Sequence, residues 1–576
     1  MAKVKKSTSI AIVAVLALAV IAGGLVKMSS GGSSKGGTIT YLTHAEAWTH
    51  ADPSRNYTGQ HIAWFGSYMH RTLTAYARAE GSAGSAVVAD LATDTGRASN
   101  GNKTWEFTLR DGVTFEDGSA ITCEDIKYGV SRTFATDVIT DGPTYAIGML
   151  DIPSAKDGSS VYKGPYSTKD NDTAAYDKAV TCSADNKTIT FNLKRPVGDF
   201  NYTVTYLSFS PVPKAKDTGD QYDLAPVSSG PYKIEKYKAK DEMVLVRNDK
   251  WNKKSDPIRN AFPDRIVVRF GLAEEVRDQL VLNDSEKNSM SLDAVLPTNL
   301  PTVFDDAGKP KGAFATRALN VYDPYVRYAA FNVKKVPCLE IRRAVYFAKD
   351  AAGLLQLSGG AAFGGDPADG VIKPLMGLDY AKVKGLEEFK PAGNAEAAKK
   401  YMDAAKTACP DVYAKATDPK RGLFFDFPDT DTNKKAAAIW IDSMKKNAGI
   451  TMKFNYIEAG SYYAVVLDQT KQCDLSRAGW APDWANASTV IPELFTKEGG
   501  FNLSQNWNDP AYAAFKKKSD ATKVETNRAK QAKGWQELAQ YVMDQYWIIR
   551  PVFSKGQFQW GSGVGGVYYW EPQGTF

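Results

Sequence analysis

The strongest constraint on the fold of this chain is a strand–helix–strand pattern between residues 423 and 457. Residues 423–427 form a short apolar run that is typical of a buried strand. A helical pattern follows from about Asn433 to Ala448 and ends at Gly449, because glycine is favoured just after a helix. Residues 450–457 have the pattern of a second strand. Two strands joined by a helix predict parallel pairing through a right-handed crossover, and therefore an α/β region with a buried sheet.

The rest of the chain contains many short alternating segments that predict half-buried strands. They lie at residues 38–43, 105–110, 188–193, 242–247, 265–270 and 473–480. Thr122 and Asp125 have the spacing of a capping box, which predicts that a helix begins there. A chain of 576 residues exceeds what one core can organise, so several domains are expected.

The first 37 residues carry the pattern of an export segment. Lys3, Lys5 and Lys6 precede an apolar run over 10–26, and a Gly/Ser-rich stretch follows. We therefore expect a signal or anchor segment at 1–28, a linker at 29–37, and an extracytoplasmic location, at the cell surface or secreted, for the remainder. Two outcomes stay open: cleavage of the segment, or its retention as a membrane anchor, for which 17 apolar residues are just sufficient.

The net charge excludes one class of partner. The chain carries +6 overall, but residues 1–35 contain five lysines and no acid, which leaves +6 − 5 = +1 for the rest. No basic stripe indicates a nucleic-acid partner.

The chain has five cysteines, so at least one thiol is unpaired within it. Disulfides form outside the cytoplasm. Cys123 and Cys182 lie in one predicted subdomain and are the preferred pair. No CxxC sequence is present, which argues against a zinc knuckle or a redox motif.

Motifs of catalysis and cofactor binding are absent or out of context. Residues 561–566 satisfy GxGxxG but lie too close to the C-terminus for a dinucleotide site, so we interpret them as a turn. The chain has no HExxH, and its GxSxG match at 32–36 lies in the Gly/Ser-rich linker, outside the strand–turn–helix context of a catalytic serine. The four histidines, all within 44–70, match no metal template. We therefore expect neither an enzyme nor a resident cofactor or metal.

Four segments together resemble the family 5 extracellular solute-binding proteins, the oligopeptide and dipeptide receptors of ABC importers. The first is TWEFTLRDGVTFEDGSAITCEDIKYGVSRTF at 104–134, and the second is SSGPYKIEKYKAKDEMVLVRNDKWN at 228–252. The third covers 331–375, and the fourth is DLSRAGWAPDW at 474–484. The likeness extends from about residue 37 to residue 576.

The resemblance implies an α/β, two-lobed periplasmic-binding-protein-like fold of cluster C type, with an extra subdomain inserted in the first lobe. Lobe I would comprise 38–72, 207–316 and 553–576, the inserted subdomain 73–206, and lobe II 317–552. The chain would cross between the lobes near residues 320–332 and 548–553, and a hinge is expected there. The protein would be a monomer.

The fourth segment would carry the ligand site. Asp483 matches the acid that holds the α-ammonium of a peptide, since a buried amine requires a counter-charge, and capping of a turn after Pro482 is its alternative role. Arg477 matches a position that can meet a peptide carboxylate, and a salt-bridged surface role is its alternative. Further expected ligand-binding residues are Trp480, Trp484, Gly479 and Ala481. In contrast to the Asp-Pro that is common in the family, residues 485–487 are Ala-Asn-Ala, which leaves the shape of this loop open.

The resemblance implies a receptor that captures short peptides in an interlobe cleft and delivers them to an ABC import permease. Main-chain hydrogen bonds would hold the extended peptide. Two alternatives remain. One is the same fold with a nickel chelate, a sugar, an opine or another small solute. The other is a secreted hydrolase, which the lack of a nucleophile motif in a catalytic context disfavours.

Overall fold

The computed structural model describes residues 35–386, 388–458 and 461–576. The expected signal or anchor segment at 1–28 and most of the linker at 29–37 lie outside these residues. Within the described part of the chain, no helix has the length and apolar character needed to cross a membrane.

The largest sheet has six strands in the order β13-β17-β12-β16-β14-β15. Its strands are β12 (Ala318–Phe331), β13 (Asp366–Pro367), β14 (Leu423–Pro428), β15 (Met452–Ile457), β16 (Leu475–Trp480) and β17 (Ile548–Gln559). β14 pairs in parallel with both β15 and β16. Since α14 (Asp431–Ala448) connects β14 to β15, the predicted strand–helix–strand unit with parallel pairing is confirmed.

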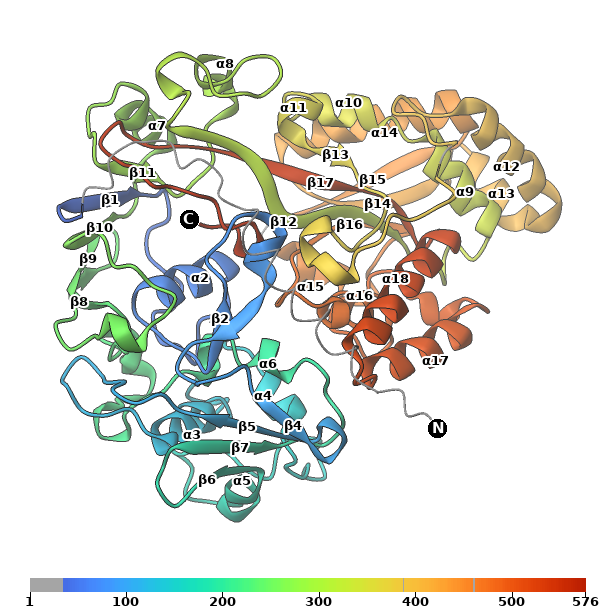
Figure 1. Cartoon of the computed structure of the whole chain (residues 1–576). Helices are drawn as coiled ribbons and strands as arrows, with labels where there is room; N and C mark the ends of the chain where they lie inside the picture. Colours follow the sequence, from blue (N-terminus) through green and yellow to red (C-terminus); the bar gives the residue numbers. More distant parts are fainter. Residues whose placement is uncertain (1–34, 387, 459–460) are drawn as a thin grey trace, which may run out of the picture.

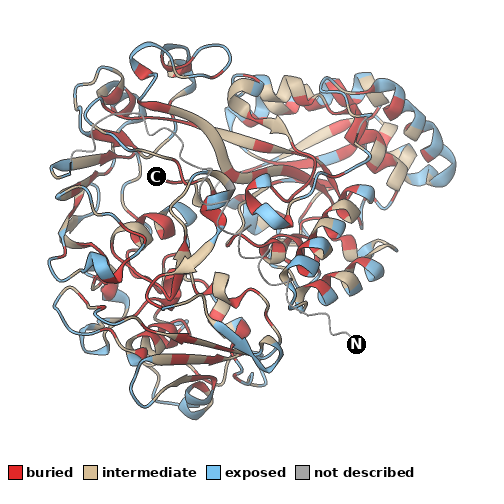
Figure 2. Ribbon diagram, viewed as in Figure 1, coloured by how far each residue is buried: buried red, intermediate tan, exposed pale blue. Residues whose placement is uncertain are grey.

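Helices surround this sheet (Figure 1). They are α9 (Leu339–Ala348), α10 (Ala351–Gln356), α11 (Ala361–Gly364), α12 (Ala395–Ala408), α13 (Pro410–Thr417), α15 (Tyr462–Val466), α16 (Ile491–Phe495), α17 (Tyr512–Lys523) and α18 (Arg528–Asp544). The Asn394 side chain caps α12 by accepting from the Ala397 amide, and Gly449 ends α14 in the left-handed conformation. Figure 2 shows buried residues concentrated on the sheet and on the helix faces toward it.

A second sheet lies apart from the first and has five strands in the order β11-β1-β10-β9-β8. Its strands are β1 (Thr38–Leu42), β8 (Tyr232–Lys238), β9 (Glu242–Arg247), β10 (Arg265–Arg269) and β11 (Ser289–Ser291). α2 (Gly59–Tyr68), α7 (Glu274–Leu282) and α8 (Leu300–Val303) belong to the same part of the molecule.

A third body contains the four-stranded sheet β4-β5-β7-β6. Its elements are β4 (Arg97–Ser99), β5 (Thr104–Thr108), α3 (Cys123–Arg132), α4 (Tyr145–Met149), α5 (Thr173–Ala179), β6 (Val180–Cys182), β7 (Thr188–Asn192) and α6 (Phe200–Thr203). The hairpin of β2 (Thr74–Tyr76) and β3 (Val87–Ala89) precedes it. Thr122 and Asp125 form the predicted capping box of α3.

Buried ion pairs join this third body to the segments that precede and follow it. Arg132, at the end of α3, donates two hydrogen bonds of 2.7 Å to the two carboxylate oxygens of Asp52, and its Nε lies 3.2 Å from Asp217. All three side chains are buried, so water does not compete with the bidentate ion pair between Arg132 and Asp52.

Two long strands, β12 and β17, connect the second sheet's body to the six-stranded sheet (Figure 1). They pair with each other in antiparallel register, with irregularities between Tyr322 and Val326 and between Arg327 and Ala329. These strands coincide with the residues at which a hinge is expected.

Two disulfides lie within the described residues. One joins Cys123 and Cys182, the preferred pair, with Cα atoms 5.7 Å apart. The other joins Cys338 to Cys409 with Cα atoms 6.0 Å apart and links the start of α9 to the junction of α12 and α13. Cys473 is a free thiol.

Replacing both Cys123 and Cys182 by alanine should lower the free energy of unfolding by about 4 kcal/mol. The cross-link spans 59 residues, and closing a loop of that size removes a corresponding entropy from the unfolded chain. Denaturant unfolding under oxidising conditions measures the loss. Cys473→Ala, which breaks no cross-link, should cost less than about 1 kcal/mol; equal losses in the two variants would contradict the expectation.

Candidate functional site

The candidate site begins where β16 ends. Three neighbouring parallel strands, β14, β15 and β16, finish at one edge of the six-stranded sheet, and the segment 481–489 follows β16 at that edge. Ligands of α/β proteins gather beyond the carboxyl ends of such strands. Asp483 lies three residues after Trp480, the last residue of β16.

Aromatic side chains from the first 210 residues surround the partly buried Asp483 carboxylate. The hydroxyl of Tyr145 donates to its Oδ2, and the hydroxyl of Tyr206 donates to its Oδ1 at 3.1 Å. Because the Tyr145 proton is directed to Asp483, the Tyr57 hydroxyl donates to the Tyr145 oxygen at 2.9 Å, and the Trp484 ring meets Tyr145 edge-on at 5.0 Å between centroids. We call Tyr57, Tyr145, Tyr206 and Trp484 the aromatic cage. The tyrosine hydroxyls therefore orient the carboxylate, and the edge-on packing of the rings fixes the hydroxyls in place.

The electrostatic state of Asp483 suits a charged partner. Burial raises the pKa of Asp483 to about 6, the hydrogen bonds from Tyr145 and Tyr206 oppose the rise, and the Glu493 carboxylate adds to it. The group is therefore mainly ionised at neutral pH, at a free-energy cost that an ammonium ion would offset.

The residues after Asp483 fasten the segment to other parts of the molecule. The indole of Trp484 donates to Asp199 at 3.0 Å, and the amide of Ala485 donates to the Tyr76 hydroxyl at 3.0 Å. Trp484 and Ala485 are buried in the hydrophobic core of the first 300 residues, whereas Trp480 packs against the core of the six-stranded sheet. The segment therefore connects two bodies, one built around the six-stranded sheet and the other around the second and third sheets, which share one core, and it places Asp483 between them.

A narrow cavity of about 30 Å³ opens beside Asp483. Its lining includes Tyr76, Arg78 and Trp570 together with Tyr206 and Asp483. A water molecule takes a similar share of liquid volume, so the cavity in this conformation is far smaller than a peptide. A larger ligand does not fit into the cavity in this conformation.

The other expected ligand residues lie near the same strand end but differ in exposure. Arg477 is exposed, and its guanidinium donates to the side chain of Asn433 near the start of α14 and lies 6.0 Å from the Phe427 ring. Trp480 is partly buried against Phe501 and donates from its indole to the Thr489 carbonyl at 3.0 Å.

The backbone of β16 offers a partly free edge. The pairing of β14 with β16 ends at Asp426 and Ser476, so Ala478–Trp480 extend beyond the paired part of β14. On the other side Gly479 is paired with Arg327 of β12. Gly479 and Ala481 are both partly buried, close to Asp483 in sequence. An extended chain could add to this edge through main-chain hydrogen bonds.

Trp484 differs from these residues because its ring packs against Tyr145 and its indole N–H donates to Asp199, so both are engaged within the protein.

The sequence analysis missed the tyrosines of the cage and Arg78. Tyr145 and Tyr206 lie 338 and 277 residues before Asp483, and no local motif marks them. The high tyrosine content, 29 residues, was the one available signal.

The four histidines have separate partners. His44 and His50 pair with Asp293 and Asp223 at 3.0 and 2.6 Å, and His70 lies 3.0 Å from the Ala51 carbonyl. His61 stacks edge-on against Trp48.

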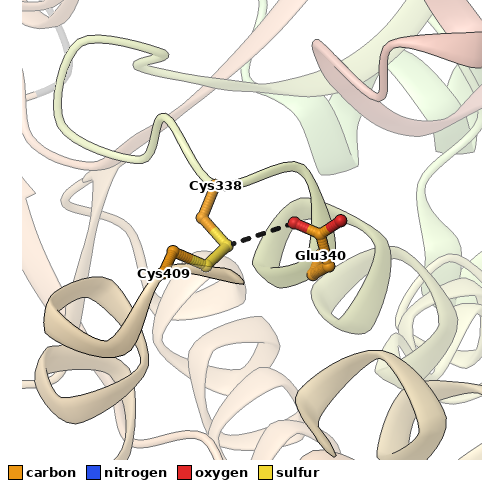
Figure 3. Close-up of side chains that lie close together, drawn as sticks. All are labelled: Cys338, Glu340 and Cys409. Carbon is orange, nitrogen blue, oxygen red and sulfur yellow. Dashed lines mark hydrogen bonds between the residues drawn. A yellow bond between two sulfur atoms is a disulfide. The ribbon is translucent and has the colours of Figure 1, made fainter. Parts of the chain in front are cut away.

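Within the described residues, one group of three side chains has the spacing of metal ligands, namely Cys338, Glu340 and Cys409 (Figure 3). The Glu340 carboxylate lies 3.6 Å from the Cys338 sulfur. Since both sulfurs are in a disulfide, neither is a thiolate, which is the form that binds metals.

Comparison with known proteins agrees with this geometry. Residues 86–502 match the model of the bacterial extracellular solute-binding proteins, family 5. The oligopeptide-binding protein OppA of Bacillus subtilis is 24% identical over 451 residues, which cover 75% of this chain and 74% of that protein.

Solved structures extend the likeness to the whole fold. Clavulanic acid biosynthesis oligopeptide binding protein 2 superposes with a TM-score of 0.80 at 26% identity, over 93% of this chain and 94% of that one. OppA of Haemophilus influenzae in complex with RPPGFSPFR shares the fold with a TM-score of 0.64 at 16% identity, over 94% and 98%. The expected two-lobed α/β fold and the family resemblance are thereby confirmed.

The raised pKa of Asp483 predicts that Asp483→Asn stabilises the ligand-free protein in a pH-dependent way. The acid has a pKa of about 6 when folded and 3.8 as its reference. Because the folded protein holds this proton more tightly than the unfolded chain does, the protonated carboxyl group stabilises the fold fully below about pH 4. This stabilisation is lost as the pH rises to about 6. Asparagine keeps a neutral side chain, so the variant should be more stable by about 1–2 kcal/mol above pH 7, a value reduced for partial exposure.

Denaturant unfolding between pH 4 and pH 8 measures this difference. Asp544→Asn, at the exposed end of α18, is the matched control and should show no pH-dependent gain. A constant difference across the range would contradict the raised pKa.

Proposed function

Since the chain belongs to the bacterial extracellular solute-binding proteins of family 5, we propose that it captures short peptides between its lobes and delivers them to an ABC import permease. The observation that carries the proposal is an ionisable carboxylate, Asp483, held between the two bodies inside an aromatic cage. This arrangement suits the free ammonium group of a peptide.

The proposed binding mode uses three features of one strand end. Asp483 would hold the ammonium, the free edge of β16 at 478–480 would bond to the peptide main chain, and Arg477 would meet a peptide carboxylate by exchanging its bond to Asn433. Trp480 would pack against a side chain of the ligand. Trp484 would act by closing the cage behind Asp483.

The proposal includes the division into lobes and the location. Lobe I would be 38–72, 207–316 and 553–576, the inserted subdomain 73–206, and lobe II 317–552; the separate sheets support this division. β12 and β17 would form the hinge. The protein would work as a monomer outside the cytoplasmic membrane, where segment 1–28 directs or anchors it.

The relatives named above support the choice of peptides, because they are described as oligopeptide-binding proteins. A ligand without an amine, such as a sugar, would leave the Asp483 charge uncompensated when the cleft closes. The proposed role is binding and delivery, without chemical change to the ligand.

Asp483→Asn should weaken the binding of peptides with a free amino group by about 2–5 kcal/mol, because it removes the counter-charge of a buried ammonium. N-acetylated peptides of the same sequence carry no such charge, so they should bind poorly to the wild type and lose much less in the variant. Isothermal titration calorimetry on the four combinations measures the coupling.

Asp544→Asn serves as the matched control and should leave the affinity for both peptides unchanged. Equal losses for acetylated and free peptides in Asp483→Asn would show that Asp483 shapes the loop without binding the ammonium. Absence of peptide binding to the wild type would refute the proposed function itself.

A further inference from the structure

A buried group of four charges lies next to the cavity beside Asp483. Arg71 lies 2.8 Å from Asp90 and 3.6 Å from Asp256, and Arg259 lies 3.0 and 3.1 Å from the same two carboxylates. Two guanidinium groups thus share two carboxylates, and all four side chains are almost completely buried. The group is balanced in charge, because its two guanidinium groups match its two carboxylates.

Arg78 is the additional cation in this region. It lies two residues beyond β2, and no carboxylate of the described residues comes within ion-pair distance of it. Asp90 is the acid that acts on the pKa of Arg78, but it is already paired with Arg71. Burial, reinforced by the neighbouring Arg259, lowers the pKa of Arg78 to about 10, so the guanidinium is still charged at neutral pH. A partly buried charge without a counter-ion is costly and favours an anionic partner.

The Arg78 side chain is oriented by Trp570. Its guanidinium carbon lies 4.3 Å from the centre of the Trp570 ring, which is a stacking contact. Trp570 is itself fixed, since its indole donates to the Gly84 carbonyl at 3.0 Å and its amide donates to the Thr575 carbonyl at 2.6 Å. A Cβ at Gly84 would lie 2.3 Å from the Ala79 carbonyl oxygen and 3.0 Å from the Trp570 ring, so glycine permits this close approach.

The stacked guanidinium keeps donors for a ligand. It carries five N–H groups in one plane, and Tyr568 engages part of them. An arginine held flat on an aromatic ring presents its remaining edge in a fixed direction, which suits bidentate binding of a carboxylate.

Arg78 and Asp483 line the same cavity. One wall therefore carries an uncompensated positive charge and another a negative charge. A ligand that carries both an ammonium and a carboxylate would satisfy both charges, whereas a purely cationic ligand would satisfy one of them and a neutral ligand neither.

We infer that Arg78, stacked on Trp570, is a specificity-determining residue that binds a carboxylate of the peptide whose ammonium group Asp483 holds. This inference rests on the proposed function and narrows its ligands to short peptides with a carboxylate near the amino terminus. Two sources supply that chemistry: the side chain of an acidic first residue, or the C-terminal carboxylate of a dipeptide.

Calorimetry with two matched peptide pairs tests the inference and separates the two sources. The first pair is Glu-Ala-Ala-amide and Gln-Ala-Ala-amide, and the second is Ala-Ala with a free or an amidated C-terminus. Wild-type protein should bind the carboxylate-bearing member of at least one pair about tenfold or more tightly. Arg78→Met, which keeps the stem on Trp570 and removes the charge, should reduce that preference to within about twofold.

Two control variants keep the test decisive. Arg78→Lys retains the charge but loses the planar guanidinium, so it should keep a reduced preference for the peptide with the carboxylate. Arg421→Met, which removes a surface ion pair with Asp418, should keep the full wild-type preference. Thermal unfolding verifies that each variant is folded; if Arg78→Met is not, the intermediate preference of Arg78→Lys decides.

Peptide binding with no carboxylate preference in the wild type, or equal losses for both members of each pair in Arg78→Met, would overturn the role of Arg78 and leave the proposed function intact. Failure of every peptide to bind the wild type would overturn the proposed function, and the inference with it.

Discussion

The antiparallel pairing of β12 with β17 is the constraint on which the arrangement of this molecule depends. These strands belong to the six-stranded sheet at one end and reach the other body at their far end, where Trp560, just after β17, bridges to Met290 of β11. Every side chain of the candidate site belongs to one body or the other. The course of these two strands therefore sets how closely Asp483 approaches Tyr145 and Tyr206.

The strand pair is locally irregular where it passes between the bodies. Near the first break in register, the Ser554 hydroxyl oxygen lies 2.8 Å from both carboxylate oxygens of Asp323, which share its one proton. The buried Lys373 ammonium donates to the carbonyls of Asp323 and Tyr325. The Lys373 side chain thus satisfies two backbone carbonyls at the irregular part of β12. A break of this kind concentrates backbone change in a few residues, as a hinge between rigid lobes requires.

The sequence contained much of the fold because the fold-determining signals are local. The run of strand, helix and strand over 423–457 and the capping box at Thr122 depend on neighbours within a few turns, and the structure contains both. Asp483 could be proposed because it stands in a short motif after a strand. Its cage could not, since Tyr145 reaches it from a helix 338 residues earlier.

The same reasoning explains why Arg78 escaped notice in the sequence. An arginine in a loop is ordinarily a solvated surface group. Its lack of a counter-ion becomes visible only when Asp90 and Asp256 are seen to be occupied by Arg71 and Arg259. Long-range charge balance of this kind has no signature along the chain, because the partners come from segments more than 150 residues apart.

Hydrogen bonds inside the aromatic cage also bear on how strongly a ligand can bind. In this conformation, the hydroxyls of Tyr145 and Tyr206 already donate to Asp483. An arriving ammonium must add to or replace these donors, so the free energy gained is the difference between a charged and a neutral partner, not the full strength of a new ion pair. The gain in binding free energy is largest for a compact charged group, because a neutral donor forms only the same kind of hydrogen bond that the tyrosine hydroxyls already form with Asp483. The cage therefore discriminates by charge more than by shape, which is consistent with a receptor that fixes the amino terminus and tolerates varied side chains elsewhere.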